Sequence, residues 1–220
     1  GDLPSRSGIG SSSAFTVGLI TSLSALVKSE FLGRTKLARL AIDIEQNDIG
    51  ETIGIQDQCA SAFGGLVHIR ADKEGIKPKR FLIRKEYQNY IESSLLMGFT
   101  GRSRFSGVAS KKVNSALQSE KNQKKLEELH EISQKGIEAF GNEADIQENA
   151  FLTRECRNIK LALNQDYGDP MLMELIEESE KAGSLCTRIM GAGGGGFFLC
   201  WAPEYKHEAI KSKINVKTWV

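Results

Sequence analysis

The sequence predicts an α+β protein built from two layered domains, and three observations lead to that class. Helical stretches alternate with short apolar strands along the 220 residues, and some of these strands are spaced as hairpins. Hydrophobic residues make up 40% of the chain, which is enough for one sizeable core or two modest ones. A polar stretch, 84–94, marks the predicted junction between a first domain over 1–86 and a second over 87–220.

The first domain is predicted to contain both helices and strands. Phe15, Leu19, Leu23 and Leu26 recur at helical spacing on one face of its first helix. Glu45 lies at the border of the apolar stripe of the second helix, one turn beyond Ala41. The predicted elements are helices over 11–28 and 37–49, a short helix between the turn at 54–57 and Gly64-Gly65, and strands over 66–70 and 80–83 around a turn at 72–75.

The second domain is predicted to mix helices and strands. Pro170 opens one helix at a position that proline favours, and Gly183 closes it as a C-cap residue. The predicted elements are a strand over 95–99, helices over 106–120, 122–141, 145–164 and 170–183, strands over 186–190 and 197–202 around a glycine loop, a helix over 204–213 and a final strand.

Charge and cysteine usage exclude several classes of function. Twenty-nine Lys and Arg face 28 Asp and Glu, so no bulk charge favours nucleic acid or an anionic membrane as a partner. The four cysteines are scattered without a C-x-x-C pair, which is typical of a reduced, cytoplasmic chain without disulfides or a zinc knot. No apolar stretch is long enough to span a bilayer, and no signal peptide opens the chain.

A glycine-serine loop, 4–14, leads directly into the first helix. Its glycines allow close approach of a ligand, and the helix start offers unpaired N–H groups and three serine hydroxyls. The pattern suits polyphosphate, although it lacks the lysine of a Walker P-loop. The alternative interpretation is a flexible loop with an ordinary serine N-cap.

Two carboxylates, Glu45 and Asp57, follow this loop. Phosphoryl transfer needs a carboxylate for the metal ion and often another near the attacking hydroxyl. Glu45 is predicted to be partly buried, with Mg²⁺ as one candidate partner. Asp57 begins a short helix, so its pKa is predicted to be low rather than raised. The alternatives are a helix cap for Asp57 and a solvated or salt-bridged edge residue for Glu45.

A second glycine loop, 191–196, contains five glycines in six positions between two apolar strands. Ordering so many glycines is entropically costly, whereas a simple hairpin needs one or two. The run therefore predicts backbone that is pressed against a ligand or another loop. A wide, flexible strand connection is the alternative interpretation.

The order of these three motifs resembles the GHMP kinases, the superfamily of galactokinase, homoserine kinase and mevalonate kinase. The family pattern P-x-x-x-G-[LI]-G-S-S-[AS]-A is met from Pro4 to Ala14, and the late glycine motif from Met190 to Gly196. In galactokinase-like members a magnesium-binding glutamate precedes the catalytic aspartate by twelve positions, and here 57 − 45 = 12. The resemblance implies a ribosomal S5 domain 2-like first part and a ferredoxin-like second domain.

The resemblance also implies an activity and a set of site residues. The expected reaction transfers a phosphoryl group from ATP, with Mg²⁺, to a sugar or sugar-phosphate hydroxyl. Asp57 is expected to be catalytic, and Ser12 with Glu45 to bind the metal. The residues expected to bind the nucleotide are Gly8, Ile9, Gly10, Ser11, Ser12, Ser13, Gly193 and Gly194.

Within the superfamily, residues 8–19 and 56–66 resemble the bacterial D-glycero-D-manno-heptose 7-phosphate kinases. Other small-molecule kinases, such as heptose 1-kinases and relatives of galactokinase or fucokinase, and a catalytically silent sugar sensor are the alternatives. Arg102 or Arg104 is a candidate for a substrate phosphate, unless both belong to an exposed basic loop. We expect both chain ends to be cut, an earlier family segment with a basic residue to be missing, and a monomer or homodimer.

Overall fold

The computed structural model describes residues 8–27, 32–102, 119, 122–163, 169–191, 194–214, 216 and 218–219. Contacts divide the chain into two compact units, Gly1–Leu82 and Ile83–Val220. The boundary between them lies four residues before the predicted one (86 − 82 = 4). Nearly all of the helix predicted over 106–120 lies outside the described residues, as does Arg104.

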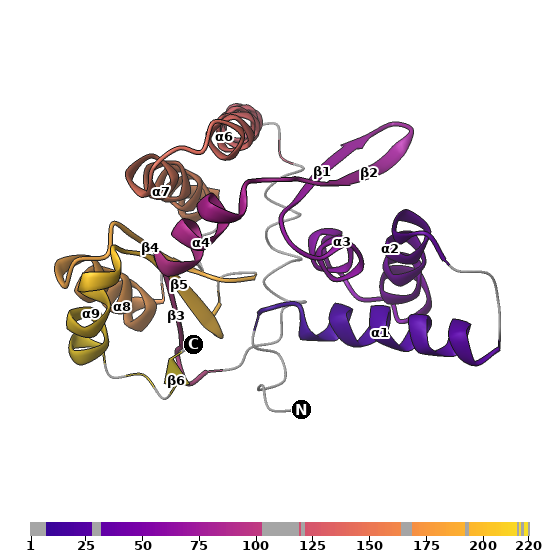
Figure 1. Cartoon of the computed structure of the whole chain (residues 1–220), viewed down its shortest axis with the longest axis horizontal. Helices are drawn as coiled ribbons and strands as arrows, with labels where there is room; N and C mark the ends of the chain where they lie inside the picture. Colours follow the sequence, from indigo (N-terminus) through magenta and orange to yellow (C-terminus); the bar gives the residue numbers. More distant parts are fainter. Residues whose placement is uncertain are drawn as a thin grey trace. The chain divides into compact units, whose positions relative to one another are not determined.

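Within the described residues, the first unit contains the α-helices α1, α2 and α3 and a β-hairpin (Figure 1). Its elements are α1 Ser11–Leu26, α2 Arg34–Asp43, the π-helical turn η1 Ile44–Asp48, α3 Gln56–Phe63, β1 Val67–Asp72 and β2 Gly75–Arg80. The second strand was predicted over 80–83, but it begins at Gly75. Gly75 has φ +114°, which lets the chain reverse after a two-residue turn instead of a longer one.

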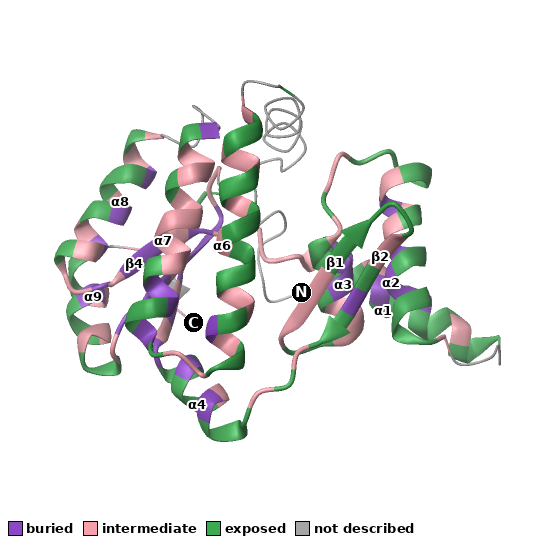
Figure 2. Cartoon of the chain, turned by 90° about the horizontal axis from the view of Figure 1, so that it is seen from above, coloured by how far each residue is buried: buried purple, intermediate pink, exposed green. Residues whose placement is uncertain are grey.

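The buried face of α1 differs from the face that the periodicity identified. Phe15 and Leu26 are 71% and 77% exposed, and Leu19 and Leu23 are exposed as well. Val17 and Ile20, on the opposite side, pack with Leu37 and Ala41 of α2. Figure 2 shows the resulting exposed surface along α1. The spacing therefore predicted the helix but not the side that contacts α2.

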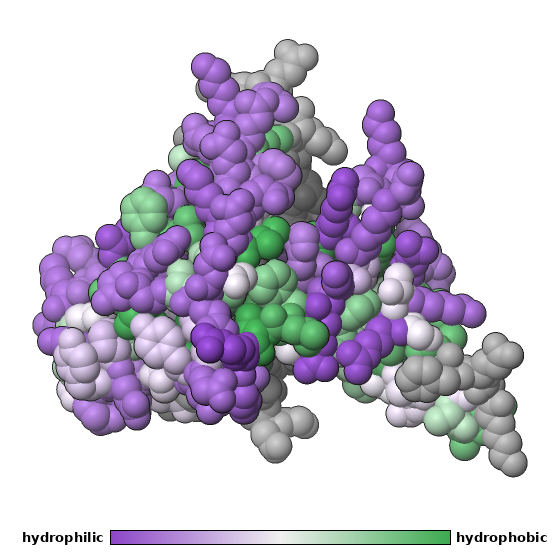
Figure 3. All heavy atoms as spheres, turned by 45° about the horizontal axis from the view of Figure 1, so that its top comes forward, coloured by the Kyte–Doolittle hydropathy of each residue, from purple (hydrophilic) through white to green (hydrophobic). Residues whose placement is uncertain are grey.

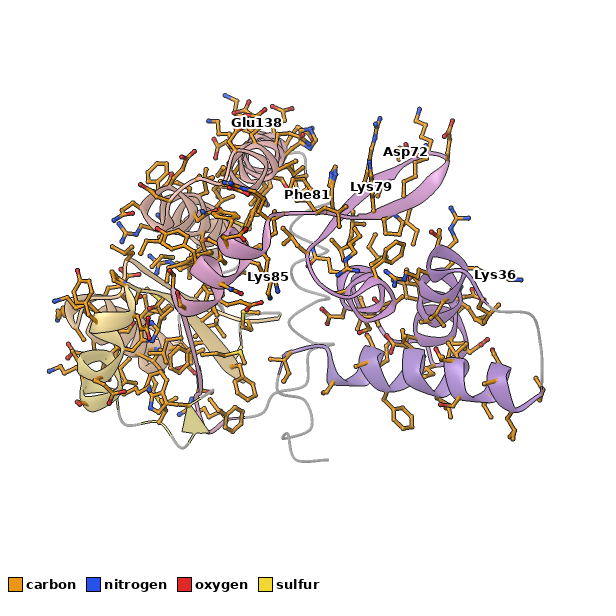
Figure 4. The ribbon with its side chains drawn as sticks, in the orientation of Figure 1. Lys36, Asp72, Lys79, Phe81, Lys85 and Glu138 are labelled. Atoms are coloured by element: carbon orange, nitrogen blue, oxygen red, sulfur yellow. The ribbon has the colours of Figure 1, made fainter. Side chains whose placement is uncertain are left out.

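The outer face of the hairpin is polar. The antiparallel register places Arg70 opposite Lys77 and His68 opposite Lys79, so these side chains share one face. Lys77 forms an ion pair of 2.9 Å with Asp72. Figure 4 shows Asp72 and Lys79 on this hairpin. Exposed ion pairs of this kind contribute about 0–1 kcal/mol, so this pair adds little to the stability of the hairpin.

The second unit is an antiparallel sheet covered by helices on both faces. The strand order is β4-β5-β3-β6. Its elements are α4 Lys85–Ser93, β3 Leu95–Phe99, α6 Gln123–Gly141, α7 Ile146–Leu163, α8 Pro170–Lys181, β4 Cys186–Ile189, β5 Phe197–Trp201, η4 Glu204–Lys206, α9 His207–Lys213 and β6 Thr218–Trp219. The predicted α+β class is therefore confirmed.

Two hydrophobic clusters fix the layers of this unit. On one face of the sheet, Phe198 and Ile189 pack against Leu172 and Ile176 of α8 and Ile210 of α9. On the other face a second cluster joins the sheet to α4 and α7. Its members are Tyr87, Ile91, Ile146, Ala150, Cys186 and Trp201. Successive side chains of a strand point to opposite faces of the sheet, so each strand contributes to both clusters. Both faces of this sheet are therefore buried.

The polar stretch predicted as a domain junction is in fact the helix α4. Tyr87 and Ile91 lie one turn apart on the helix and are 5% and 7% exposed, while their neighbours remain in solvent. Two buried residues in nine do not form a long apolar stripe, so the periodicity was too weak to predict the helix. The Tyr87 hydroxyl donates to the carbonyl of Ala144 at 2.9 Å, which fixes α4 beside the start of α7.

Polar side chains cover most of the surface visible in Figure 3. None of the helices within the described ranges is both long and apolar enough to cross a membrane.

The four cysteines are free thiols with different environments, and they predict a labelling pattern. Burial raises the pKa of Cys186 and of Cys200 to about 11, and it also raises the pKa of Cys59. A raised pKa lowers the thiolate fraction at a given pH, so a group with pKa 11 is about one part in a thousand thiolate at pH 8. We expect the half-buried Cys156 to react first with a maleimide at pH 8.

Mass spectrometry of the labelled chain measures this order. The Cys156→Ser variant should lose the fast phase, and the other three thiols should react only as the chain unfolds. A second fast thiol in the folded variant would contradict the burial described here.

Candidate active site

Glu45 lies in the short π-helical turn that ends α2. The turn is closed by the Ile49 N–H, which donates to the carbonyl of Ile44 at 2.9 Å. Single π-turns within helices are rare and are frequent at functional sites. Here the wider turn leaves Glu45 facing the core of the first unit, where only 1% of its surface is exposed. The prediction that Glu45 is buried is confirmed, and the solvated-edge alternative is excluded.

Three side chains hold the Glu45 carboxylate. Ser13 donates to Oε2 at 2.9 Å, and Gln58 donates to the same oxygen at 2.5 Å. Thr16 donates to Oε1 at 2.8 Å. The carboxylate therefore joins α1, the end of α2 and α3, and its orientation is fixed by donors from both neighbouring helices.

The hydroxyls that meet Glu45 belong to Ser13 and Thr16 rather than to Ser12, the predicted metal partner. Ser12 is exposed, whereas Ser13 is 3% exposed. Thr16 and Gln58 were missed by the sequence reasoning. The available signals were their spacings: Thr16 follows Ser13 by three residues, which places both on one face of α1, and Gln58 adjoins Asp57.

The first turn of α1 presents N–H groups without a side-chain acceptor. Its N-cap is Gly10, which has φ +73° and no side chain to cap the helix. Such a start leaves the first N–H groups of a helix available to an anion. Gly8, Ile9 and Gly10 are half-buried and lead into Ser11, so the described part of the predicted loop ends directly at this uncapped helix start.

Asp57 packs directly against this turn. A Cβ atom added at Gly10 would lie 3.1 Å from Cγ of Asp57, so only glycine allows the backbone to approach the carboxylate this closely. Asp57 is in the first turn of α3, as predicted. No hydrogen bond from its side chain caps that helix within the described residues, so the helix-cap alternative is not supported.

The prediction of a low pKa for Asp57 is wrong. Partial burial, first, and the negative charge of Glu45, second, raise the pKa of Asp57 above its ordinary value. Both effects disfavour the carboxylate form, and they outweigh the helix start on which the prediction depended. A carboxyl group with a raised pKa is a better proton acceptor once ionised than an ordinary aspartate.

Gly10→Ala is expected to disturb this contact. The substitution forces an alanine to φ +73° and against Asp57, so the free energy of unfolding should fall by about 1–2 kcal/mol. Gly18→Ala is the matched control, because Gly18 is in α1 with no atom within 4 Å of an added Cβ, and it should be neutral or slightly stabilising. Thermal unfolding compares the two, and equal effects would contradict the close approach.

The carboxylates and hydroxyls fit a magnesium ion. Mg²⁺ usually binds to one or two protein carboxylates, with water and substrate phosphates completing its shell. Glu45 and Asp57 are near enough for the charge of one to affect the other, and Oε1 of Glu45 accepts a single hydrogen bond within the described residues. No cluster of three or more His, Cys, Asp or Glu side chains that could hold a metal ion occurs within the described residues.

The second glycine loop packs on another loop of its own unit. Gly196 donates to the carbonyl of Arg102 at 2.8 Å and accepts from Thr100 at 2.9 Å, and a Cβ at Gly195 would lie 3.4 Å from that same Arg102 oxygen. The predicted close contact with another loop is therefore confirmed for this end of the run. Gly194 is half-buried, and Gly193 lies outside the described residues.

Comparisons with known proteins define the class of this fold and site. Residues 1–65 match the family model described as the GHMP kinases N terminal domain. The chain is 29% identical to the D-glycero-alpha-D-manno-heptose 7-phosphate kinase of Campylobacter jejuni, over 96% of this chain and 62% of that protein. It is also 29% identical to the mevalonate kinase of Thermococcus onnurineus, over 97% of this chain and 61% of that protein.

The fold agrees with these relatives. A D-glycero-D-manno-heptose 1-phosphate kinase from Bacteriodes thetaiotaomicron superposes with a TM-score of 0.67 at 22% identity, covering 96% of this chain and 58% of its own. The predicted resemblance to the GHMP kinases is thus found both in sequence and in fold. The chain spans about three fifths of the length of the curated relatives that it matches.

Proposed function

We propose that the protein to which this chain belongs transfers the γ-phosphoryl group of ATP to a hydroxyl of a sugar or sugar phosphate. The observation that carries the proposal is the contact between Asp57 and Gly10, which places a carboxylate against the turn suited to phosphate. The GHMP kinase relatives support phosphoryl transfer as the chemistry.

Each group of the site has a role in an in-line transfer. The N–H groups of residues 8–12 bind the phosphates of ATP at the start of α1. Asp57 accepts a hydrogen bond from the acceptor hydroxyl, orients it toward the γ-phosphorus and takes its proton as the new P–O bond forms. The raised pKa of Asp57 favours this role as a base.

Glu45 and Ser12 would hold Mg²⁺, which when bound offsets the negative charge of the phosphates. Ser13, Thr16 and Gln58 keep the Glu45 carboxylate in one orientation. The second glycine loop is expected to brace the phosphate-binding turn or to face the acceptor, with Gly193 and Gly194 near the nucleotide.

The most specific form of the proposal names D-glycero-D-manno-heptose 7-phosphate as the acceptor, at its O1 hydroxyl. The heptose 7-phosphate kinase relative supports it at 29% identity. Mevalonate kinases match at the same level, so mevalonate is the second candidate acceptor. A sensor that binds sugar and nucleotide without turnover is the non-enzymatic alternative, and the arrangement of Glu45 and Asp57 favours an enzyme over it.

The test is ADP release by the full-length protein with MgATP. The acceptors are heptose 7-phosphate, free heptose, galactose, fucose and mevalonate, each compared with a reaction without acceptor. We expect release with heptose 7-phosphate. ADP release with mevalonate alone would identify mevalonate, rather than a sugar, as the acceptor. ATP binding without ADP release in any of the reactions would favour the sensor.

A further inference from the structure

Basic side chains of α7 reach the exposed edge of the sheet in the second unit. Strand β4 is at that edge. Arg154 donates to the carbonyl of Leu185, and Arg157, three residues later, donates to the carbonyl of Thr187 at 2.7 Å. A step of three residues along the helix thus matches a step of two along the strand, and each guanidinium satisfies a carbonyl at the sheet edge.

Lys160 is the next residue in this series, three positions beyond Arg157. The series therefore continues toward the end of β4. Side chains alternate across a strand, and Cys186 packs in the cluster on the α4 and α7 side of the sheet. Arg188, two residues further, lies on that same side. Burial, first, and the charge of Arg188, second, lower the pKa of Lys160, as expected for two adjoining cations.

These two cations have no carboxylate partner within the described residues, where the one opposing influence on the pKa of Lys160 is that of Cys156. Arg157 has such a partner, since it forms an ion pair of 2.6 Å with Glu180. Within the part of the chain that the structure describes, neither Lys160 nor Arg188 makes a hydrogen bond or ion pair. Both side chains are half-buried. Cations that lose hydration and repel one another are stabilised by an anion between them.

We propose that Lys160 and Arg188 bind the phosphate group of a phosphorylated sugar acceptor. The inference rests on the proposed function, because it assigns the anion to the acceptor of that reaction. A guanidinium can bind two phosphate oxygens and an ammonium adds a compact charge, so the pair suits a phosphate dianion. Arg188 precedes the second glycine loop by three residues, next to the segment expected to face the acceptor.

Arg102, the residue that the sequence suggested for this role, is engaged elsewhere. Its guanidinium donates to Asp169 at 3.1 Å. Asp169 in turn caps α8 by accepting from the Met171 N–H at 3.0 Å. Arg102 therefore already has an anionic partner within its own unit, whereas no such partner of Lys160 or Arg188 is found among the residues that the structure describes, and Arg102→Gln is the matched control.

The first experiment titrates inorganic phosphate into the 220-residue chain at constant ionic strength, followed by backbone amide signals in NMR. We expect the signals of Lys160 and Arg188 to shift, and Arg188→Gln and Lys160→Gln each to weaken this response about tenfold or more. Shifts at Ser11 to Ser13 should persist in both variants. The site would be overturned if phosphate shifted no amide signals of α7 and β4, or if Lys160→Gln responded to phosphate as strongly as the parent chain. The second comparison holds even if Arg188→Gln misfolds.

The second experiment identifies the source of the phosphate with the full-length kinase. Arg188→Gln should raise KM for the phosphorylated acceptor about tenfold and leave KM for ATP unchanged, whereas Arg102→Gln should change neither. A raised KM for ATP would assign the anion to the nucleotide and refute the acceptor. If no acceptor is phosphorylated, the proposed function fails, and the NMR titration still decides whether this phosphate site exists.

Discussion

Asp57→Ala is expected to lower kcat of the proposed phosphoryl transfer by the full-length protein by about 10²–10⁴-fold, the usual contribution of a positioned base. The affinity for ATP should stay within a factor of two or so, because the proposed phosphate contacts are to backbone N–H groups at the start of α1 rather than to this side chain. Removing the carboxylate should also relieve its repulsion with Glu45, so the variant is expected to be at least as stable as the parent.

Single-turnover kinetics and nucleotide titration measure the two quantities separately. Asp48→Ala is the matched control, because Asp48 is an exposed acid in the adjoining π-turn and should leave kcat unchanged. Asp57→Asn keeps the shape and removes the base, so it should be nearly as slow as Asp57→Ala. An unchanged kcat in either Asp57 variant would refute the assigned role.

The two carboxylates of the candidate site were predictable because their motifs are local. The spacing of twelve between Glu45 and Asp57, the glycines before α1 and the turn before α3 are all readable in sequence order. Fold class followed in the same way, from helices and strands with clear periodicity. Hairpin register was less predictable, since the positive φ at Gly75 rather than the apolar pattern decides where β2 begins.

The remaining features depend on contacts between distant residues. The bond from Gln58 to Glu45 spans thirteen positions, and the ladder from α7 to β4 spans about thirty. The side of α1 that is buried depends on where α2 packs, so Phe15 and Leu19 are exposed despite their spacing. The pKa of Asp57 likewise follows from burial and a neighbour, neither of which a helix start reveals.

Glu45→Ala is expected to have the largest effect on the first unit itself. Without the carboxylate, the hydroxyl of Ser13 and the amide of Gln58 lose their acceptor in a buried site, and the bond from Thr16 is lost as well. The amide oxygen of Gln58 already has no partner within the described residues, so this side chain would then be wholly unpaired. We expect the free energy of unfolding to fall by about 3 kcal/mol.

The chain offers a way to localise this loss. Both tryptophans, Trp201 and Trp219, are in the second unit, so their fluorescence follows that unit, whereas hydrogen exchange of α2 follows the first. Faster exchange in α2 with a smaller change in the fluorescence midpoint is the expected result.

Glu45→Gln keeps one acceptor and should be about 1 kcal/mol less stable than the parent. Both Glu45 variants should weaken Mn²⁺ binding, which EPR measures. Full stability in Glu45→Ala would contradict the role of this carboxylate as the hydrogen-bonded centre of the unit, because no other described acceptor replaces it for Gln58.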